Sequence, residues 1–220
     1  MRRESDYFLR IIHQFTAVIM EVSRLNRHRN GAADDLIVQT TTELIDLTPH
    51  ALAQMRDEDV LGVLQLQARN EWPARAVLLA TLLWEAGRAT DNNSLAVAQF
   101  QQALSLTLAV CIEQWELPDF APTVADLLDL LADYLLPGTI QRRLLLYYET
   151  VGAFGQAEDV LFDWQETAVF QPQDDSPDPT QVGIAFYQRL LQKSDEDLIA
   201  GGLPRAEVET GLDELLTHQS

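Results

Sequence analysis

The feature that most constrains the fold is a run of large and small residues at fixed spacing: Tyr148, Gly152, Phe154, Ala157 and Leu161. Apolar residues before Gly152 recur at helical spacing, and a glycine can adopt the left-handed backbone that ends a helix. Ala157 follows one short turn later, where only a small side chain lets a second helix approach the first. Val160, Leu161 and Trp164 then share one helical face. The run therefore predicts two packed helices over about residues 139–170.

A looser copy of this pattern lies upstream: Leu79, Ala80, Leu83, Gly87, Ala96, Phe100, Ala103 and Leu104. It has four extra residues in the polar segment 88–93, where an insertion costs little. The two runs resemble the tetratricopeptide repeat, whose period is about 34 residues. The resemblance implies an all-α helical-repeat array (an α-α superhelix) of about four helix pairs, with a long N-terminal helix and a C-terminal helical cap.

The first helix is expected from Ser5 to His28, with apolar residues in alternating steps of three and four: Phe8, Ile11, Phe15, Val18, Val22 and Leu25. Such a stripe is typical of a coiled-coil seam. Two interpretations remain open. The helix can pack along its own chain as a cap, or it can pair with its counterpart in a homodimer through Phe8, Phe15 and Val22.

Apolar periodicity, prolines and capping residues predict further helices over about residues 33–47, 57–69, 73–87, 94–115, 122–137, 184–191, 194–200 and 203–216. In the last of these, four residues are expected to face inward: Val208, Leu212, Leu215 and Leu216. Segment 171–180 holds three prolines and three aspartates without a large apolar residue, which is typical of a linker. We therefore expect a helical-repeat domain over 1–170 and a C-terminal helical cap over 181–220 that packs on the same domain.

Three stretches together resemble a bacterial family of unknown function with tetratricopeptide-like helices. They are Asp6–Ile11, Gln156–Phe162, and the segment from Gly183 through Lys193-Ser194-Asp195-Glu196 to Arg205. The resemblance spans most of the chain and is most specific at its two ends. It implies a helical fold and no particular activity.

The composition narrows the classes of partner. The net charge of −19 disfavours nucleic-acid backbones and anionic membrane surfaces, because both need cationic patches. Cys111 is the only cysteine, so no internal disulfide is expected. No apolar run reaches the roughly 20 residues that span a bilayer. Met1-Arg2-Arg3 is followed by the polar residues 4–6 and not by a hydrophobic stretch, so a secretory signal is not expected. We expect a cytoplasmic protein.

Residues with catalytic potential are few. Cys111 lies in an apolar run and is interpreted as an inert thiol, and the four histidines are scattered. Three acidic pairs have a spacing that would place two carboxylates on one helix face, as in metal-dependent helical hydrolases: Glu43/Asp46, Glu113/Glu116 and Asp126/Asp129. In a chain with 34 acidic residues such pairs also arise by chance. We expect a non-enzymatic protein without a metal or cofactor.

Binding is the function that the sequence favours, because the first helix of each repeat lines a concave surface in helical-repeat proteins. In the tetratricopeptide register the groove-facing residues would be Val77, Thr81, Trp84 and Glu85 in one pair, and Arg142, Leu146, Glu149 and Thr150 in the other. Of these, Trp84, Arg142, Leu146 and Glu149 are the candidate contacts to a protein or peptide partner, since Trp and Arg often anchor interfaces. The alternatives are a homo-oligomeric structural protein and a metal-dependent helical hydrolase.

Overall fold

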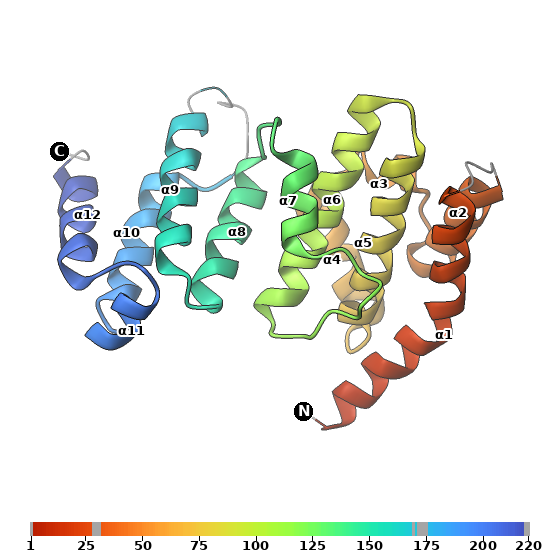
Figure 1. Cartoon of the computed structure of the whole chain (residues 1–220), viewed down its shortest axis with the longest axis horizontal. Helices are drawn as coiled ribbons and strands as arrows, with labels where there is room; N and C mark the ends of the chain where they lie inside the picture. Colours follow the sequence, from red (N-terminus) through yellow and green to blue (C-terminus); the bar gives the residue numbers. More distant parts are fainter. Residues whose placement is uncertain (1, 28–31, 169, 171–175, 218–220) are drawn as a thin grey trace. The chain divides into compact units, whose positions relative to one another are not determined.

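The computed structural model describes residues 2–27, 32–168, 170 and 176–217, with side chains described from Phe8 onward. In these ranges the chain forms helices and no strand (Figure 1). The chain divides into two compact units, residues 1–134 and 135–220. The all-α class predicted from the sequence is confirmed for the described residues.

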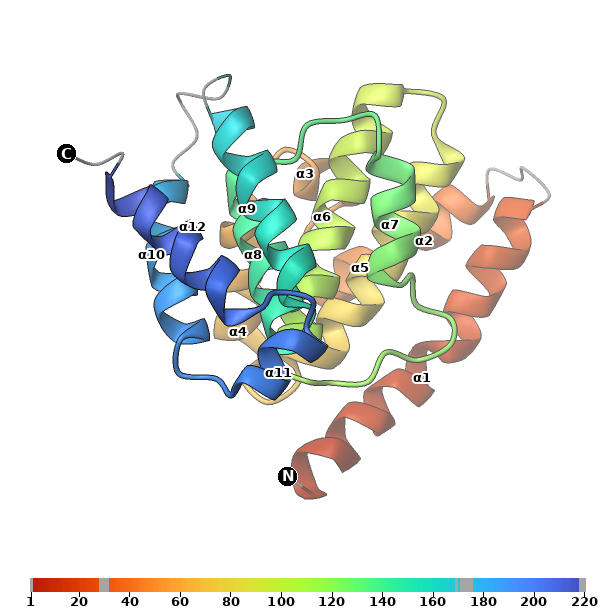
Figure 2. The same ribbon diagram turned by 60° about the vertical axis from the view of Figure 1, so that its left-hand side comes forward.

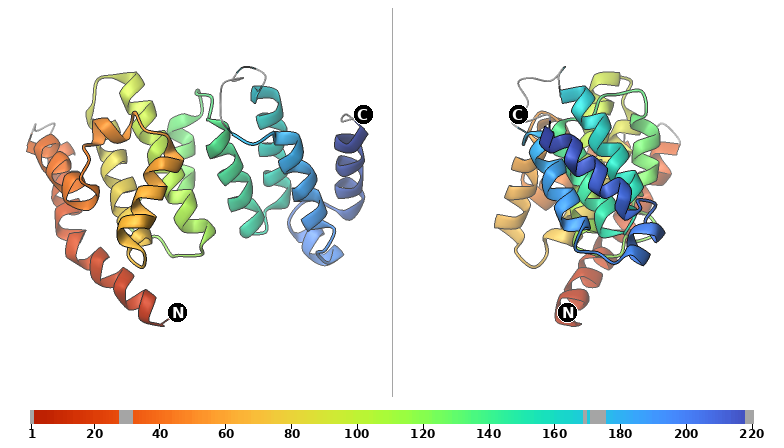
Figure 3. Two further views of the ribbon diagram at one scale, coloured as in Figure 1. Left: turned by 180° about the vertical axis from the view of Figure 1, so that it is seen from behind. Right: turned by 90° about the vertical axis from the view of Figure 1, so that its left-hand side faces the viewer.

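The first unit contains α1 (Arg2–Arg27), α2 (Ala32–Ile45), α3 (Pro49–Leu52), α4 (Asp57–Ala68), α5 (Trp72–Ala89), α6 (Asn93–Ile112) and α7 (Val124–Leu131). Its core is the α5–α6 pair, on which α1, α2 and α4 pack against α5 and α7 packs against α6. Figures 1 and 3 show α4 and α7 on opposite sides of this pair. Both core helices are therefore apolar on nearly every face.

The α5–α6 contact depends on Gly87. A Cβ atom at this position would lie 2.9 Å from Cδ1 of Phe100, inside the distance that real contacts allow. The sequence pattern placed both residues in one run and ended the first helix at Gly87, but α5 continues to Ala89. Gly87 is required because it lets the Phe100 ring approach the backbone of α5, and it plays no part in ending the helix.

Helix α6 is long and apolar enough to cross a membrane by length and composition, the one such helix in the part of the chain that the structure describes. Its most apolar stretch is 67% buried inside the protein. The expectation that no stretch of the chain is apolar and long enough to span a bilayer is therefore wrong for α6. Burial against α5 and α7 accounts for the composition.

Helix α1 packs on α5 and α2, and its N-terminal part runs past the ends of α5 and α6 (Figures 1 and 2). Phe8 is buried, with its ring stacked on Trp115 at 5.1 Å between centroids, and Val22 is completely buried. Phe15 is half-buried. Two of the three residues predicted for a homodimer seam are thus already covered by their own chain.

The second unit contains α8 (Gly138–Thr150), α9 (Phe154–Ala168), α10 (Pro179–Leu190), α11 (Asp195–Ala200) and α12 (Arg205–Thr217). Helices α8 and α9 are the pair that the Tyr148–Leu161 run predicted. Gly152 has a φ of 78°, and Ala157 and Leu161 are fully buried. The prediction of a helix, a glycine turn and a second packed helix is confirmed here.

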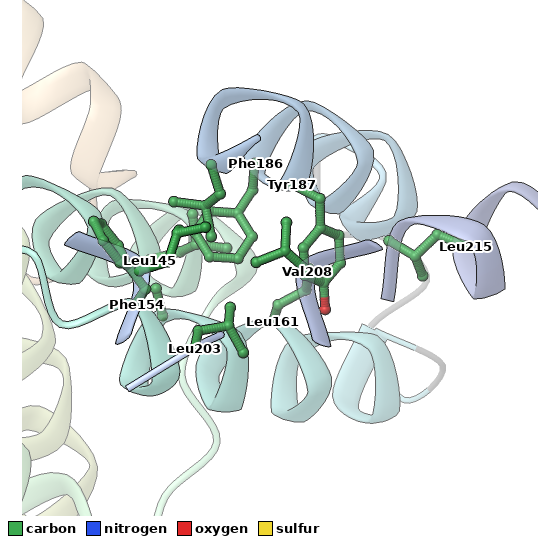
Figure 4. Packing of buried hydrophobic residues seen from close by; sticks show 11 residues of the cluster. Leu145, Phe154, Leu161, Phe186, Tyr187, Leu203, Val208 and Leu215 are labelled. Atoms are coloured by element: carbon green, nitrogen blue, oxygen red, sulfur yellow. The ribbon is translucent and has the colours of Figure 1, made fainter. Parts of the chain in front are cut away.

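Helices α10, α11 and α12 complete the core of the second unit. Its largest buried members include Phe186 and Tyr187 of α10, which meet Leu161 of α9 in Figure 4. Gly183 and Gly211 sit where helices approach closely: a Cβ at Gly183 would lie 2.7 Å from Leu215, and one at Gly211 would lie 2.5 Å from the Tyr187 ring. These contacts pack α10 against α12, and at Gly183 also against Leu161 of α9.

The structure differs from the predicted elements in local details. The predicted helix over 33–47 ends at Ile45, and the short helix α3, which the sequence analysis did not predict, follows it. Its start is capped by the Thr48 side chain, which accepts a hydrogen bond from the Ala51 amide. Helix α6 ends at Ile112 rather than at Trp115, because Gln114 adopts a φ of 60°. Leu216 was expected to face inward and is 45% exposed, because α12 turns it away from the core.

The predicted linker over 171–180 lies partly outside the described residues, since 171–175 are not described. Helix α10 begins within that segment, at Pro179, and Asp178 caps it by accepting a hydrogen bond from the Thr180 amide. The boundary between the compact units falls at residue 135, well before this segment. The division into a repeat domain over 1–170, a linker and a cap over 181–220 stays a prediction.

Candidate functional site

The groove-facing residues predicted on α5 are mostly not available to a partner. Val77, Thr81 and Glu85 are no more than 2% exposed, because α5 is the covered core helix of its unit. Trp84 is half-buried, and the guanidinium of Arg88 lies 4.7 Å from the centre of its ring. The prediction of a concave surface along α5 was wrong for the three buried residues.

The predicted contacts on α8 belong to the second unit and are only partly open. Arg142 is exposed and Leu146 is half-buried. Glu149 accepts two hydrogen bonds from Arg189 of α10, at 2.8 Å from Nε and 2.7 Å from Nη2. These bonds hold the pKa of Arg189 above its usual range. Arg142 is therefore the candidate of this group that is most open to a partner.

Of the three acidic pairs considered as metal ligands, only Asp126 and Asp129 lie on one helix, α7, as the spacing predicted. Asp46 follows the end of α2 with a φ of 59°, and Glu113 and Glu116 follow the end of α6. Asp126 is engaged in the cap of α7, where it accepts hydrogen bonds from the Thr123 amide and hydroxyl. No three His, Cys, Asp or Glu side chains in the described ranges are grouped so as to hold a metal ion.

Cys111 is half-buried near the end of α6, and burial raises its pKa to about 11. Nucleophilic attack and metal binding need the thiolate, which is a minor form of such a thiol at neutral pH. This agrees with the interpretation of Cys111 as an inert thiol.

A buried tyrosine and an acidic group meet at the edge of the second core. The Tyr187 hydroxyl donates a hydrogen bond of 2.7 Å to Glu158. Burial raises the pKa of Glu158, the Tyr187 bond opposes this shift, and the nearby charges of Glu207, Asp159 and Glu214 raise it further. Burial also raises the pKa of Tyr187. The carboxylate form of Glu158 is thus disfavoured in the folded chain.

The raised pKa of Glu158 predicts that this carboxyl group lowers the stability of the folded chain as the pH rises. Below the ordinary value of 4.5, Glu158 is protonated in both the folded and the unfolded chain and costs nothing. As the pH rises through the window between 4.5 and the raised pKa, the unfolded chain loses the proton first, so stability is lost. We expect Glu158→Gln to gain stability over the wild type at neutral pH and to lose this advantage near pH 4.5, as measured by urea unfolding at both pH values. A larger advantage at the acidic end would contradict the assignment.

An open pocket of about 290 Å³ lies at one end of the first unit, where α4 ends and α5 begins. We call it the tryptophan pocket and define it by its lining residues: Gln65, Arg69, Asn70, Trp72, Pro73, Glu113 and Trp115. Three separate segments build it, namely the end of α4, the start of α5 and the chain that follows α6. Its lining combines two aromatic side chains with two charged ones.

Local features position the two indoles. Trp72 and Pro73 open α5, where a proline costs no hydrogen bond in the first turn. Trp115 follows the turn at Gln114, and its ring is stacked on Phe8 of α1. Both tryptophans are half-buried. Each indole is thus held by its own chain while part of its surface faces the pocket.

The charged residues of the pocket have no partner in the described part of the chain. Arg69 and Glu113 are both exposed, and no hydrogen bond or ion pair joins either side chain to another described residue. Sequence reasoning missed this site because it extended the helix through Trp115, which would have left that indole on a helix face. The sequence did contain a signal for this site. Of the chain's four tryptophans, Trp72 precedes a proline that suits a helix start, and Trp115 follows a long apolar run.

Comparison with known proteins identifies a family whose function is unknown. A model described as a family of unknown function (DUF6483) matches residues 2–220, so the chain belongs to this family over nearly its whole length. The chain matches no curated protein and no solved structure.

Proposed function

We propose that this member of a family of unknown function is a non-enzymatic protein that binds a segment of a partner protein, with the tryptophan pocket as the anchor. The observation that carries the proposal is the pair of half-buried indoles, Trp72 and Trp115, beside a guanidinium that has no partner among the described residues. Tryptophan and arginine are enriched among the residues that dominate binding energy, above all where they line a partly dry pocket.

The chemistry of the pocket supports a polypeptide ligand. Flat indole surfaces bind proline rings, aromatic rings and aliphatic chains, and the indole N–H can donate to a carbonyl. The amides of Gln65 and Asn70 can each donate to and accept from a peptide backbone. A volume of about 290 Å³ is at the small end for a ligand site, so it suits one or two side chains of a longer segment.

The finer architecture belongs to the same proposal. A tetratricopeptide-like array would present such a segment along a row of helix pairs, and the α8–α9 pair with its glycine turn supports that arrangement. A cytoplasmic location also remains part of the proposal. The homodimer remains the alternative, although Phe8 and Val22 would have to leave the packing that they make in their own chain.

The proposal predicts that peptide binding depends on Trp72. A random peptide library displayed on phage would be selected against the full chain, and the selected peptides would be remeasured by fluorescence polarisation. We expect Trp72→Ala to weaken binding by roughly 30-fold, because loss of such an anchor costs about 2 kcal/mol or more. Circular dichroism checks that the variant is folded, and Trp72→Phe keeps a flat apolar side chain and should retain most of the affinity.

Arg142→Glu is the matched control, since it changes the exposed arginine of the surface that the sequence predicted. We expect it to leave the affinity unchanged. If Arg142→Glu removes binding and Trp72→Ala does not, the partner binds on α8 instead. A library that yields no specific peptide for the wild type would contradict the peptide-binding function itself.

A further inference from the structure

The tryptophan pocket carries two opposite charges that do not neutralise each other. Arg69 follows the last residue of α4, and Glu113 follows the last residue of α6, so the two charges come from different segments of the lining. No ion pair within 4.0 Å joins them, and neither side chain has another partner in the described ranges. Two unpaired charges in one small pocket leave it with a positive and a negative side.

The alternatives to a ligand with both charges are less well matched. A polyanion would be repelled by the Glu113 carboxylate and by the protein's net charge of −19. A purely cationic ligand would be attracted by Glu113 and by the indole faces but repelled by Arg69. A purely apolar ligand would cover both charges without replacing the water that solvates them.

We infer that the tryptophan pocket recognises a peptide motif in which a proline or aromatic residue is flanked by an acidic residue on one side and a basic residue on the other. The flat central side chain binds between Trp72 and Trp115, the acidic residue pairs with Arg69, and the basic residue pairs with Glu113. This inference rests on the proposed function and adds the chemistry of the partner. It also sets the direction in which the segment lies, because the two charges of the pocket distinguish its ends.

The test is an exchange of the two charges. The double variant Arg69→Glu/Glu113→Arg keeps the net charge of −19 and the tryptophans, and it alters two exposed side chains that have no partner in the described part of the chain. Libraries of peptides blocked at both ends are selected against the wild type and against the double variant. Blocking removes the charges of the peptide termini, so any charge that is selected must come from side chains.

We expect the wild type to select motifs with an acid and a base around a flat residue, and the double variant to select the same motif with the charges in reversed order. The peptide selected by the wild type should bind the double variant at least about tenfold more weakly, and reversing its two charges should restore the affinity. Arg142→Glu is again the control, because it changes an exposed arginine outside the pocket.

Three results would overturn the inference, and they differ from failure of the proposed function. The wild type and the double variant could select the same peptides, in which case Arg69 and Glu113 do not recognise charges on the peptide. Only peptides with free ends could bind, in which case the pocket reads a terminus or a free amino acid. The selected motif could carry charges of one sign only. Binding of peptides would persist in all three results, whereas failure of the proposed function leaves no peptide bound at all.

Discussion

Replacing Phe186 by alanine is expected to lower the free energy of unfolding of the second unit by about 3–5 kcal/mol. Phe186 has no exposed surface, and it lies in the cluster that joins α8, α9, α10, α11 and α12. Figure 4 shows its ring among side chains from several of these helices, including Leu145 and Leu161. Truncation removes the buried ring and leaves a cavity that the surrounding helices can fill only in part. Urea unfolding followed by circular dichroism measures the loss.

The control is a phenylalanine of the same unit that is not packed. Phe170 is 76% exposed, so Phe170→Ala removes the same atoms without opening a cavity and should change the stability by less than about 0.5 kcal/mol. Equal effects of the two substitutions would contradict the packing around Phe186. Because this cluster lies in residues 135–220, amide hydrogen exchange should show the weakened protection in that unit.

Replacing Glu85 by alanine is expected to destabilise the first unit by about 2–4 kcal/mol. Glu85 is 2% exposed on α5 and accepts hydrogen bonds from Ser23 at 2.5 Å and from the Asn26 amide at 2.8 Å. Both donors belong to α1. Alanine leaves these donors without their acceptor in a buried interface and opens a cavity beside them. Thermal or urea unfolding measures the loss, and hydrogen exchange in α1 shows whether that helix detaches.

Arg88→Ala is the matched control for Glu85. The guanidinium of Arg88 lies 4.0 Å from the Glu85 carboxylate, but Arg88 is 47% exposed, so the ion pair is screened by water. Its loss, together with the stacking on Trp84, should cost about 1 kcal/mol or less. If Glu85→Ala costs no more than Arg88→Ala, the bonds to α1 do not hold the two helices together.

The elements that the sequence predicted well are those whose signals are local. The α8–α9 pair follows from a glycine that needs a positive φ and from small and apolar residues within one turn of it. The short helix α11 was predicted from Ser194, whose side chain accepts a hydrogen bond from the Asp197 amide, and from the glycines after it. Local patterns of this kind depend on neighbouring residues alone, and these are visible in the sequence.

Several of the predicted groove-facing residues are buried or engaged within the chain, because the exposure of a side chain is not a local property. Val77 and Thr81 have the spacing of a groove-facing helix, but they lie on a helix that is covered on several sides. The spacing of residues along α5 cannot show that α1, a long helix from the start of the chain, packs on α5. The same holds for Glu149, which is engaged by Arg189 from a helix forty residues further along the chain.

The sequence by itself determined that this protein is all-helical and where most of its helices begin and end, because backbone propensity, capping and periodicity act over a few residues. Only the tertiary structure decided which helix faces are covered and which side chains meet. The tryptophan pocket assembles residues between 65 and 115 from three segments, and its two unpaired charges become neighbours only after α4, α5 and α6 have packed. Burial and electrostatic pairing depend on distance in space, which spacing along the chain does not encode.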